Sequence, residues 1–133
     1  MKKTIILILM FMMILASCAG KNKKEDVSVN FKMVSMAEGI EIAKKNPDAI
    51  IVDVRREDEY KAGHIPGAVL LTMETITEEI ATKILPDKNQ MILIYCRSGR
   101  RSKIAAKSLL DLESTNLIEF GGILDYKGDV EKE

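Results

Sequence analysis

The stretch Cys96-Arg97-Ser98-Gly99-Arg100-Arg101 constrains the fold of this chain more than any other, because it joins an apolar run to an amphipathic segment. Residues 91–95 form a short, continuous apolar run, which predicts a buried β-strand. In residues 102–112 apolar side chains recur at helical spacing, which predicts an amphipathic helix with Ser98 or Ser102 as its cap. We therefore expect a strand, a short loop and a helix in that order, with Cys96 where the strand ends.

A cysteine at this position is predicted to be a nucleophile. The N-terminus of a helix presents unpaired backbone N–H groups and the positive end of the helix dipole, and both favour a thiolate or an anionic substrate. Arg97, Arg100 and Arg101 add positive charge, and Gly99 permits backbone conformations that other residues resist. The alternative is that Cys96 is a small buried apolar residue, as most free cysteines are. The polar, arginine-rich residues that follow Cys96 without a gap favour the reactive thiol.

Predicted strands and helices alternate along the rest of the chain. Further strands are expected at residues 31–33, 49–52, 68–71 and 116–120, and further helices at 36–45, 57–62, 76–84 and after the glycine pair 121–122. The strands are apolar runs, which predicts an α/β domain with a largely parallel sheet covered by helices on both faces. Ligands of such sheets bind beyond the carboxyl ends of the strands, where Cys96 and Asp53 both lie.

The first residues have the pattern of a secretory leader. Lys2 and Lys3 precede an apolar run over residues 5–15, which is shorter than the roughly 20 residues of a transmembrane helix. Leu15-Ala16-Ser17-Cys18 then resembles the bacterial lipobox, in which the cysteine is lipidated and becomes the mature N-terminus. We expect a signal peptide at 1–17, a lipidated Cys18 with a flexible tether at 18–30, and one domain at 31–133. The alternative is an ordinary secretory signal in which the cysteine is accidental.

These expectations determine the compartment and the cysteine chemistry. A lipid on Cys18 would anchor the domain to the membrane outside the bacterial cytoplasm and leave Cys96 as the one free thiol. One free cysteine and one histidine exclude the usual zinc sites, so no metal and no cofactor are expected. Once Lys2 and Lys3 are removed, acidic residues outnumber basic ones by two, which argues against nucleic acid as a partner.

Three stretches of this sequence, taken together, resemble the rhodanese family of sulfurtransferases, and they spread over nearly all of the mature domain. They are Asp53-Val54-Arg55 with Glu59-Tyr60 and Gly63-His64-Ile65-Pro66-Gly67-Ala68; Tyr95 to Ser102; and Phe120-Gly121-Gly122-Ile123. Family members often carry a tryptophan after the double glycine, where this chain has Tyr126.

The resemblance implies a five-stranded, mostly parallel sheet with helices on both faces, and a cysteine that carries sulfane sulfur as a persulfide. On this sequence the persulfide residue is Cys96, and the backbone N–H groups of residues 96–101, next to Ser102, surround its outer sulfur. Arg97, Arg100 and Arg101 are candidates for recognising an anionic donor, and which of them points inward stays open. Asp53 and Arg55 either border the pocket or hold the loop scaffold by hydrogen bonds.

The expected reaction moves sulfur from a small anionic donor such as thiosulfate, through Cys96, to a thiol or cyanide, with a protein as an alternative acceptor. We expect a monomer. A persulfide carrier or protein-interaction module without small-molecule turnover is the second hypothesis. A phosphatase or arsenate reductase is disfavoured, because cysteine phosphatases place an arginine six positions after the cysteine, where this chain has Ser102. His64 lies in a glycine- and proline-containing turn, which favours a structural role over a Cys-His pair.

Overall fold

The structure, a computed structural model, describes residues 30–133. The expected signal peptide, the lipidated Cys18 and all but the last residue of the tether lie outside the described residues. None of the helices between residues 30 and 133 combines the length and the apolar character that a membrane crossing requires.

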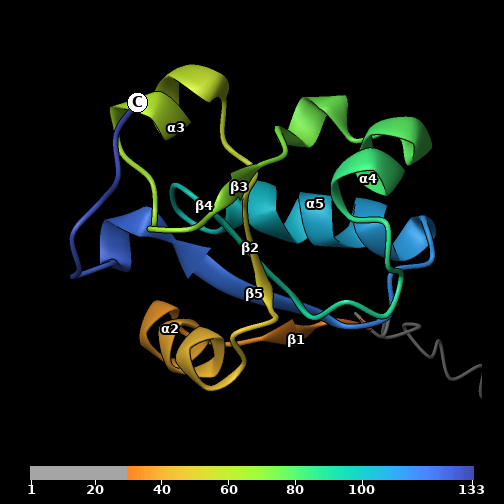
Figure 1. The fold of residues 1–133 in the computed structure, drawn as a ribbon, viewed down its shortest axis with the longest axis horizontal. Coiled ribbons are helices and arrows are strands. Elements are labelled where there is room, and N and C mark those ends of the chain that lie inside the picture. The colour runs from red at the N-terminus through yellow and green to blue at the C-terminus, as the bar shows by residue number, and fades with distance from the viewer. Residues whose placement is uncertain (1–29) are drawn as a thin grey trace, which may run out of the picture.

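The domain is built on a five-stranded sheet in the order β1-β5-β4-β2-β3 (Figure 1). Each pair of neighbouring strands within residues 30–133 is parallel, which confirms the expected sheet. The strands are β1 (Lys32–Met33), β2 (Ile50–Asp53), β3 (Val69–Leu70), β4 (Ile92–Cys96) and β5 (Leu117–Gly122). All five residues of β4, the central strand, are buried, as expected for an apolar run covered on both faces.

Helices cover both faces of the sheet, so the α/β expectation is confirmed. They are α2 (Met36–Lys45), α3 (Glu57–Ala62), α4 (Glu78–Ile84) and α5 (Arg100–Asp111), with 3-10 turns η1 (Met73–Thr75) and η2 (Ile123–Asp125). In one apolar core, α4 and α5 pack against Ile92 and Ile94 of β4. In the other, α2 packs against the opposite side of the sheet, through Leu93 and Tyr95. Figure 1 shows α2 on the far side of the strands from α4.

The helix boundaries follow local hydrogen bonding. At the start of α2, the Glu38 N–H donates to the Ser35 hydroxyl at 3.2 Å, and the Ser35 N–H donates to the Glu38 carboxylate at 3.0 Å. This reciprocal cap satisfies two of the N–H groups that a helix start leaves unpaired. The observed helix α4 is shorter than the expected helix over 76–84. Thr77 is its N-cap, so the helix begins at Glu78 and Ile76 lies before it.

The prediction that Ser98 or Ser102 caps α5 is wrong. The N-cap is Gly99, which has φ 101° and no side chain to contribute. This left-handed conformation is one that glycine adopts without steric cost. It turns the Gly99 N–H toward Cys96, while the Ser102 hydroxyl lies inside the fold. At the start of this helix no side chain caps the backbone, and the Gly99 N–H donates to the thiol of Cys96.

Candidate active site

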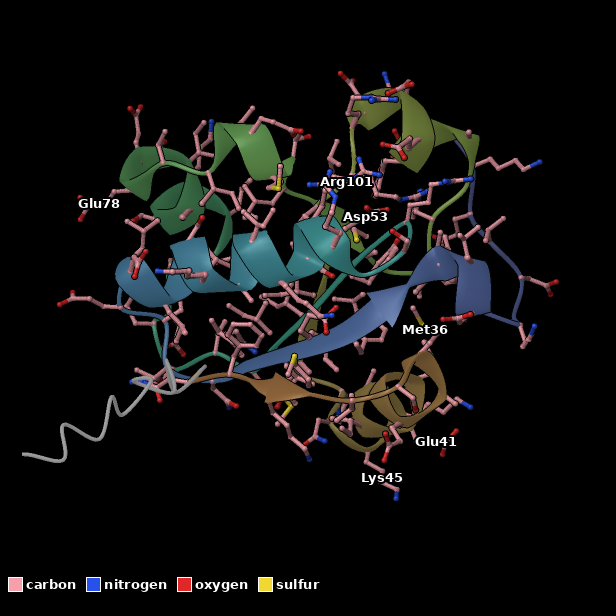
Figure 2. The ribbon with its side chains drawn as sticks, turned by 180° about the vertical axis from the view of Figure 1, so that it is seen from behind. Met36, Glu41, Lys45, Asp53, Glu78 and Arg101 are labelled. Carbon is pink, nitrogen blue, oxygen red and sulfur yellow. The ribbon has the colours of Figure 1, made fainter. Side chains whose placement is uncertain are left out.

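Cys96 is the last residue of the central strand and its side chain is enclosed by the loop that follows it. Only 1% of the residue is exposed. Ile94 pairs with Glu119 of β5 but Cys96 pairs with Gly122, so the register shifts where the strand meets the loop. The sheet thus ends in an irregularity at the thiol, as is common beside functional sites. Arg101 near the start of α5 and Asp53 at the end of β2 both lie at this end of the sheet (Figure 2).

The loop surrounds the sulfur with hydrogen-bonding groups. The Gly99 N–H donates to Cys96 Sγ at 3.0 Å, and Ser102 Oγ lies 3.5 Å from the same atom. The end of β5 closes the other side, because a Cβ atom on Gly122 would collide with the backbone of Arg97. The Leu124 N–H also donates to the Arg97 carbonyl at 3.3 Å. The backbone of the loop is therefore held between α5 and β5.

These contacts make the thiol more acidic. Burial raises the pKa of Cys96, but hydrogen bonds from the Ser102 hydroxyl and from the N–H groups of Ser102, Gly99 and Ser98 lower the pKa by more. The balance is a pKa below the ordinary value for cysteine, which increases the thiolate fraction at neutral pH. The largest favourable contributions come from groups that touch the sulfur, and not from the arginines.

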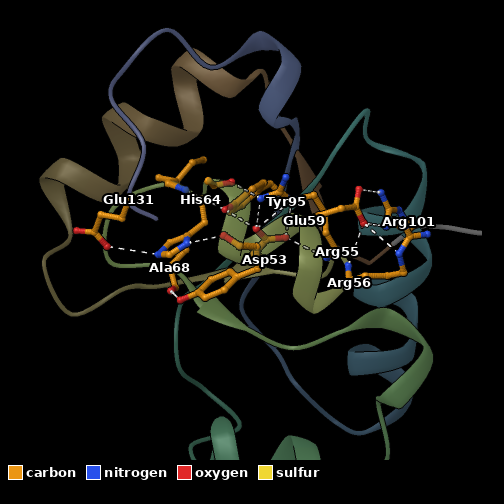
Figure 3. Close-up of polar contacts among 12 residues, drawn as sticks. Asp53, Arg55, Arg56, Glu59, His64, Ala68, Tyr95, Arg101 and Glu131 are labelled. Carbon is orange, nitrogen blue, oxygen red and sulfur yellow. Dashed lines mark hydrogen bonds and ion pairs between the residues drawn. The ribbon is translucent and has the colours of Figure 1, made fainter. Parts of the chain in front are cut away.

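The three arginines have different positions. Arg101 makes a two-pronged ion pair with Glu59 of α3, at 2.7 and 2.8 Å, which holds the pKa of Glu59 to about 2 (Figure 3). Arg97 and Arg100 are exposed, one in the loop and one at the start of α5. Arg97 and Arg100 therefore keep their guanidinium groups available for an incoming anion, whereas Arg101 already binds a carboxylate.

A buried carboxylate behind the thiol escaped the sequence reasoning. Glu119 of β5 is 3% exposed and its side chain shares the sheet face of Leu117 and Cys96. Its Oε1 accepts hydrogen bonds from the Ser102 hydroxyl at 2.6 Å and from the Gly121 N–H at 2.9 Å. The available signal was a charged residue inside an apolar strand that is buried on both faces, where charges are rare without a reason.

Asp53 and Arg55 form a scaffold on the other face of the sheet. The Arg55 guanidinium donates to both Asp53 oxygens at 2.7–3.0 Å and to the Gly63 carbonyl at 2.7 Å. The Tyr95 hydroxyl donates to Asp53 at 2.8 Å and accepts from the Ile65 N–H at 3.0 Å (Figure 3). This network fastens the turn after α3 to β2 and β4. Of the two roles considered for Asp53 and Arg55, the contacts favour the hydrogen-bonded scaffold.

His64 belongs to the same turn. Its ring stacks on Tyr60 with centroids 3.7 Å apart, and its Nδ1 lies 2.8 Å from the Tyr60 carbonyl oxygen. Its Nε2 lies 3.4 Å from Glu131 Oε2. The backbones of His64 and Glu131 also form an isolated antiparallel bridge. These contacts support a structural role for His64, because they tie α3 to the end of the chain.

Comparisons with known proteins find similarity to rhodanese-like domains. Residues 36–132 match the rhodanese-like domain family. "Thiosulfate sulfurtransferase PspE" of Escherichia coli (strain K12) is 35% identical over 74 residues, which are 56% of this chain and 70% of that protein. The solved structure "rhodanese with anions from E. coli" has a TM-score of 0.58 and 28% identity, over 64% of this chain and 99% of that chain.

The same domain also resembles part of larger proteins. The "tRNA uridine(34) hydroxylase" of Hamiltonella defensa subsp. Acyrthosiphon pisum (strain 5AT) is 33% identical over 86 residues. The match covers 62% of this chain but 24% of that protein, so the shared part is about a quarter of the hydroxylase.

Proposed function

The chain belongs to the rhodanese-like domain family, and we propose that it is a sulfurtransferase in which Cys96 carries sulfane sulfur as a persulfide. The observation that carries this proposal is the hydrogen bond from the Gly99 N–H to Cys96 Sγ, within a loop enclosed by α5 and β5. Backbone donors that point at the site of negative charge stabilise a thiolate, and they would equally stabilise the outer sulfur of a persulfide.

The reaction has two displacement steps. The Cys96 thiolate attacks the outer sulfur of thiosulfate, so that a new S–S bond forms and the donor's S–S bond breaks, with its electron pair leaving on sulfite. A thiol or cyanide then attacks the outer sulfur of the persulfide and releases the Cys96 thiolate again. Arg97 and Arg100 would attract the doubly charged donor, because the planar guanidinium group suits oxyanions.

Transfer of sulfur from thiosulfate to cyanide by the purified protein tests this function. We expect turnover in the wild type and none in Cys96→Ala or Cys96→Ser, with the far-ultraviolet circular dichroism spectrum unchanged. Undiminished transfer in Cys96→Ala would remove Cys96 from the mechanism.

A persulfide carrier is the second candidate, favoured by the relative in which the matched region is about a quarter of a larger enzyme. A carrier would take up one sulfur per Cys96 and then turn over slowly with small acceptors. Single-turnover loading with a low steady-state rate would therefore support the carrier, and rapid steady-state turnover would support the enzyme.

We further propose that a lipid on Cys18 anchors the domain to the membrane, with the domain located outside the bacterial cytoplasm. The support is the lipobox-like sequence at 15–18 behind a short apolar run. In this proposal the polar stretch up to residue 30 would serve as the tether between the lipid and the domain. The domain is proposed to act as a monomer.

A further inference from the structure

The buried carboxylate of Glu119 shares a neighbour with the sulfur of Cys96. Ser102 Oγ lies 2.6 Å from Glu119 Oε1 and 3.5 Å from Cys96 Sγ, so one hydroxyl bridges the two groups. Within residues 30–133, no ion pair joins a basic side chain to Glu119. A buried carboxylate that lacks a cation is costly, and a position beside a reactive thiol gives a reason to keep one.

The Ser102 hydroxyl has a single proton but three neighbours that can accept it, because the Gly99 carbonyl oxygen also lies 3.0 Å from Ser102 Oγ. While the Ser102 O–H donates to ionised Glu119, Ser102 Oγ can only accept from Cys96, which then carries its S–H proton. In the second arrangement Cys96 is a thiolate and Glu119 carries a proton of its own. The Ser102 hydroxyl can then donate its proton to the thiolate. The two arrangements differ by the transfer of one proton along the three groups.

We propose that Glu119 is a positioning residue that takes up the Cys96 thiol proton through the Ser102 hydroxyl. In this step the S–H bond breaks as a proton passes to Ser102 Oγ, and the original O–H bond breaks as its proton passes to Glu119 Oε1. The products are a thiolate and a neutral carboxyl group, so the net charge of the site is unchanged and no other reactant is needed. Ser102 then donates to the thiolate.

The transfer also removes the like charge nearest the thiolate along this path. Ionised Glu119 would repel a thiolate, whereas neutral Glu119 leaves the donors of the loop unopposed. The other charged groups on the neighbouring elements are exposed or already paired: Arg97 in the loop, Arg100 and Arg101 on α5, Glu59 on α3, Glu74 on η1 and Lys32 on β1. In this proposal the loss of the Cys96 proton is therefore linked to the gain of a proton by Glu119.

The pair predicts a particular pH profile for the alkylation of Cys96 by iodoacetamide. In the full-length wild type, the rate should rise in two steps, because the first proton leaves a pair that shares the second one. Glu119→Gln should show one step, about one to two pH units below the upper step of the wild type, since a nearby charge in a protein interior is removed. Glu57→Gln, which removes an exposed carboxylate on α3, is the matched control and should keep both steps.

Two further measurements keep the test decisive if Glu119→Gln folds poorly. The carbon-13 NMR signal of the Glu119 carboxyl group in the wild type should follow the same two steps as the alkylation rate. Ser102→Ala should raise the pH at which Cys96 reacts, because the thiolate loses its hydroxyl donor. A single alkylation step in the wild type that Glu119→Gln leaves in place, or a Glu119 signal that ignores the Cys96 titration, would overturn the proposal.

The inference rests on the proposed role of Cys96, but alkylation involves no sulfur donor or acceptor. A two-step profile without thiosulfate turnover would preserve the proton path and remove the sulfurtransferase. Turnover with a single-step profile would do the reverse.

Discussion

Glu59 binds both terminal nitrogens of the Arg101 guanidinium group, at 2.7 and 2.8 Å, although the two residues are 42 positions apart in the chain. The pair connects α3 to the start of α5, directly after the loop that follows Cys96. It commits Arg101 to a structural contact and leaves Arg97 and Arg100 as the exposed cations of the loop region.

Loss of this ion pair should reduce stability in a pH-dependent way. The pKa of Glu59 falls from 4.5 to about 2 in the folded protein. The main cause is the hydrogen bond from Arg101, which outweighs the rise in pKa that partial burial causes. The stabilisation is therefore complete above about pH 4.5 and lost as the pH falls toward 2. We expect Glu59→Gln to lower the free energy of unfolding at pH 7 by about 1–3 kcal/mol. Urea unfolding at several pH values measures the difference.

In that series the gap between wild type and Glu59→Gln should narrow as the pH approaches 2. Glu57→Gln, whose carboxylate forms an exposed pair with Lys61, serves as control and should match the wild type at pH 7. A gap that stays constant from pH 7 to pH 2 would contradict an ionic origin.

Replacement of Arg97 or Arg100 by glutamine should weaken binding of the anionic donor. Each change should raise the KM for thiosulfate by a factor of up to roughly five, as expected for loss of an exposed charged contact of about 1 kcal/mol. The alkylation profile of Cys96 should change little, because the main groups that lower its pKa are hydrogen-bond donors next to the sulfur. A large shift of the profile with an unchanged KM would reverse this assignment.

Substitution of Gly122 by alanine should damage the site through sterics alone. The added Cβ would overlap the carbonyl group of Arg97 and the Cα of Ser98, which are backbone atoms and cannot rotate away. We expect about 1–3 kcal/mol of destabilisation, as for other overpacked sites, together with loss of sulfur transfer. Thermal unfolding and turnover per folded molecule measure the two effects.

Gly67→Ala is the matched control, because its Cβ would meet no atom within 4 Å while its φ of 81° still carries conformational strain. It should lose some stability and keep its turnover. If Gly67→Ala and Gly122→Ala lost turnover equally, the overlap of the Gly122 Cβ with the backbone of Arg97 and Ser98 would not explain the loss.

The lipid anchor is tested by Cys18→Ser. If residues 15–18 act as a lipobox, the variant should no longer incorporate labelled fatty acid and should leave the membrane fraction. Sulfur transfer by the domain should persist, because Cys96 is in a different part of the chain. Fatty-acid labelling of Cys18→Ser at the wild-type level would refute the lipobox assignment.

The order of the strands and helices was predictable because continuous apolar runs and helical spacing are local signals. Residues 91–95 predicted the central strand, and Ser35 and Glu38 are the kind of pair that caps a helix such as α2. The position of Cys96 before a helix followed from the same patterns. The five-stranded arrangement, by contrast, came from the family resemblance and is confirmed by the sheet.

What the sequence could not supply were the long-range partners. The contact of Glu59 with Arg101, and that of Ser102 with Glu119, depend on how α3, α5 and β5 meet in space. The cap of α5 was also mispredicted, because serine is a frequent N-cap and only the loop geometry shows that Gly99 directs its N–H to the sulfur. These contacts determine which groups are free to act on a substrate.

The most direct test of the account is the mass of the Cys96 peptide after the protein has been incubated with thiosulfate and the excess removed. The account predicts a gain of one sulfur atom on that peptide, its disappearance after addition of cyanide with formation of thiocyanate, and no gain in Cys96→Ser. A Cys96 peptide of unchanged mass in a protein that still transfers sulfur to cyanide would contradict the account.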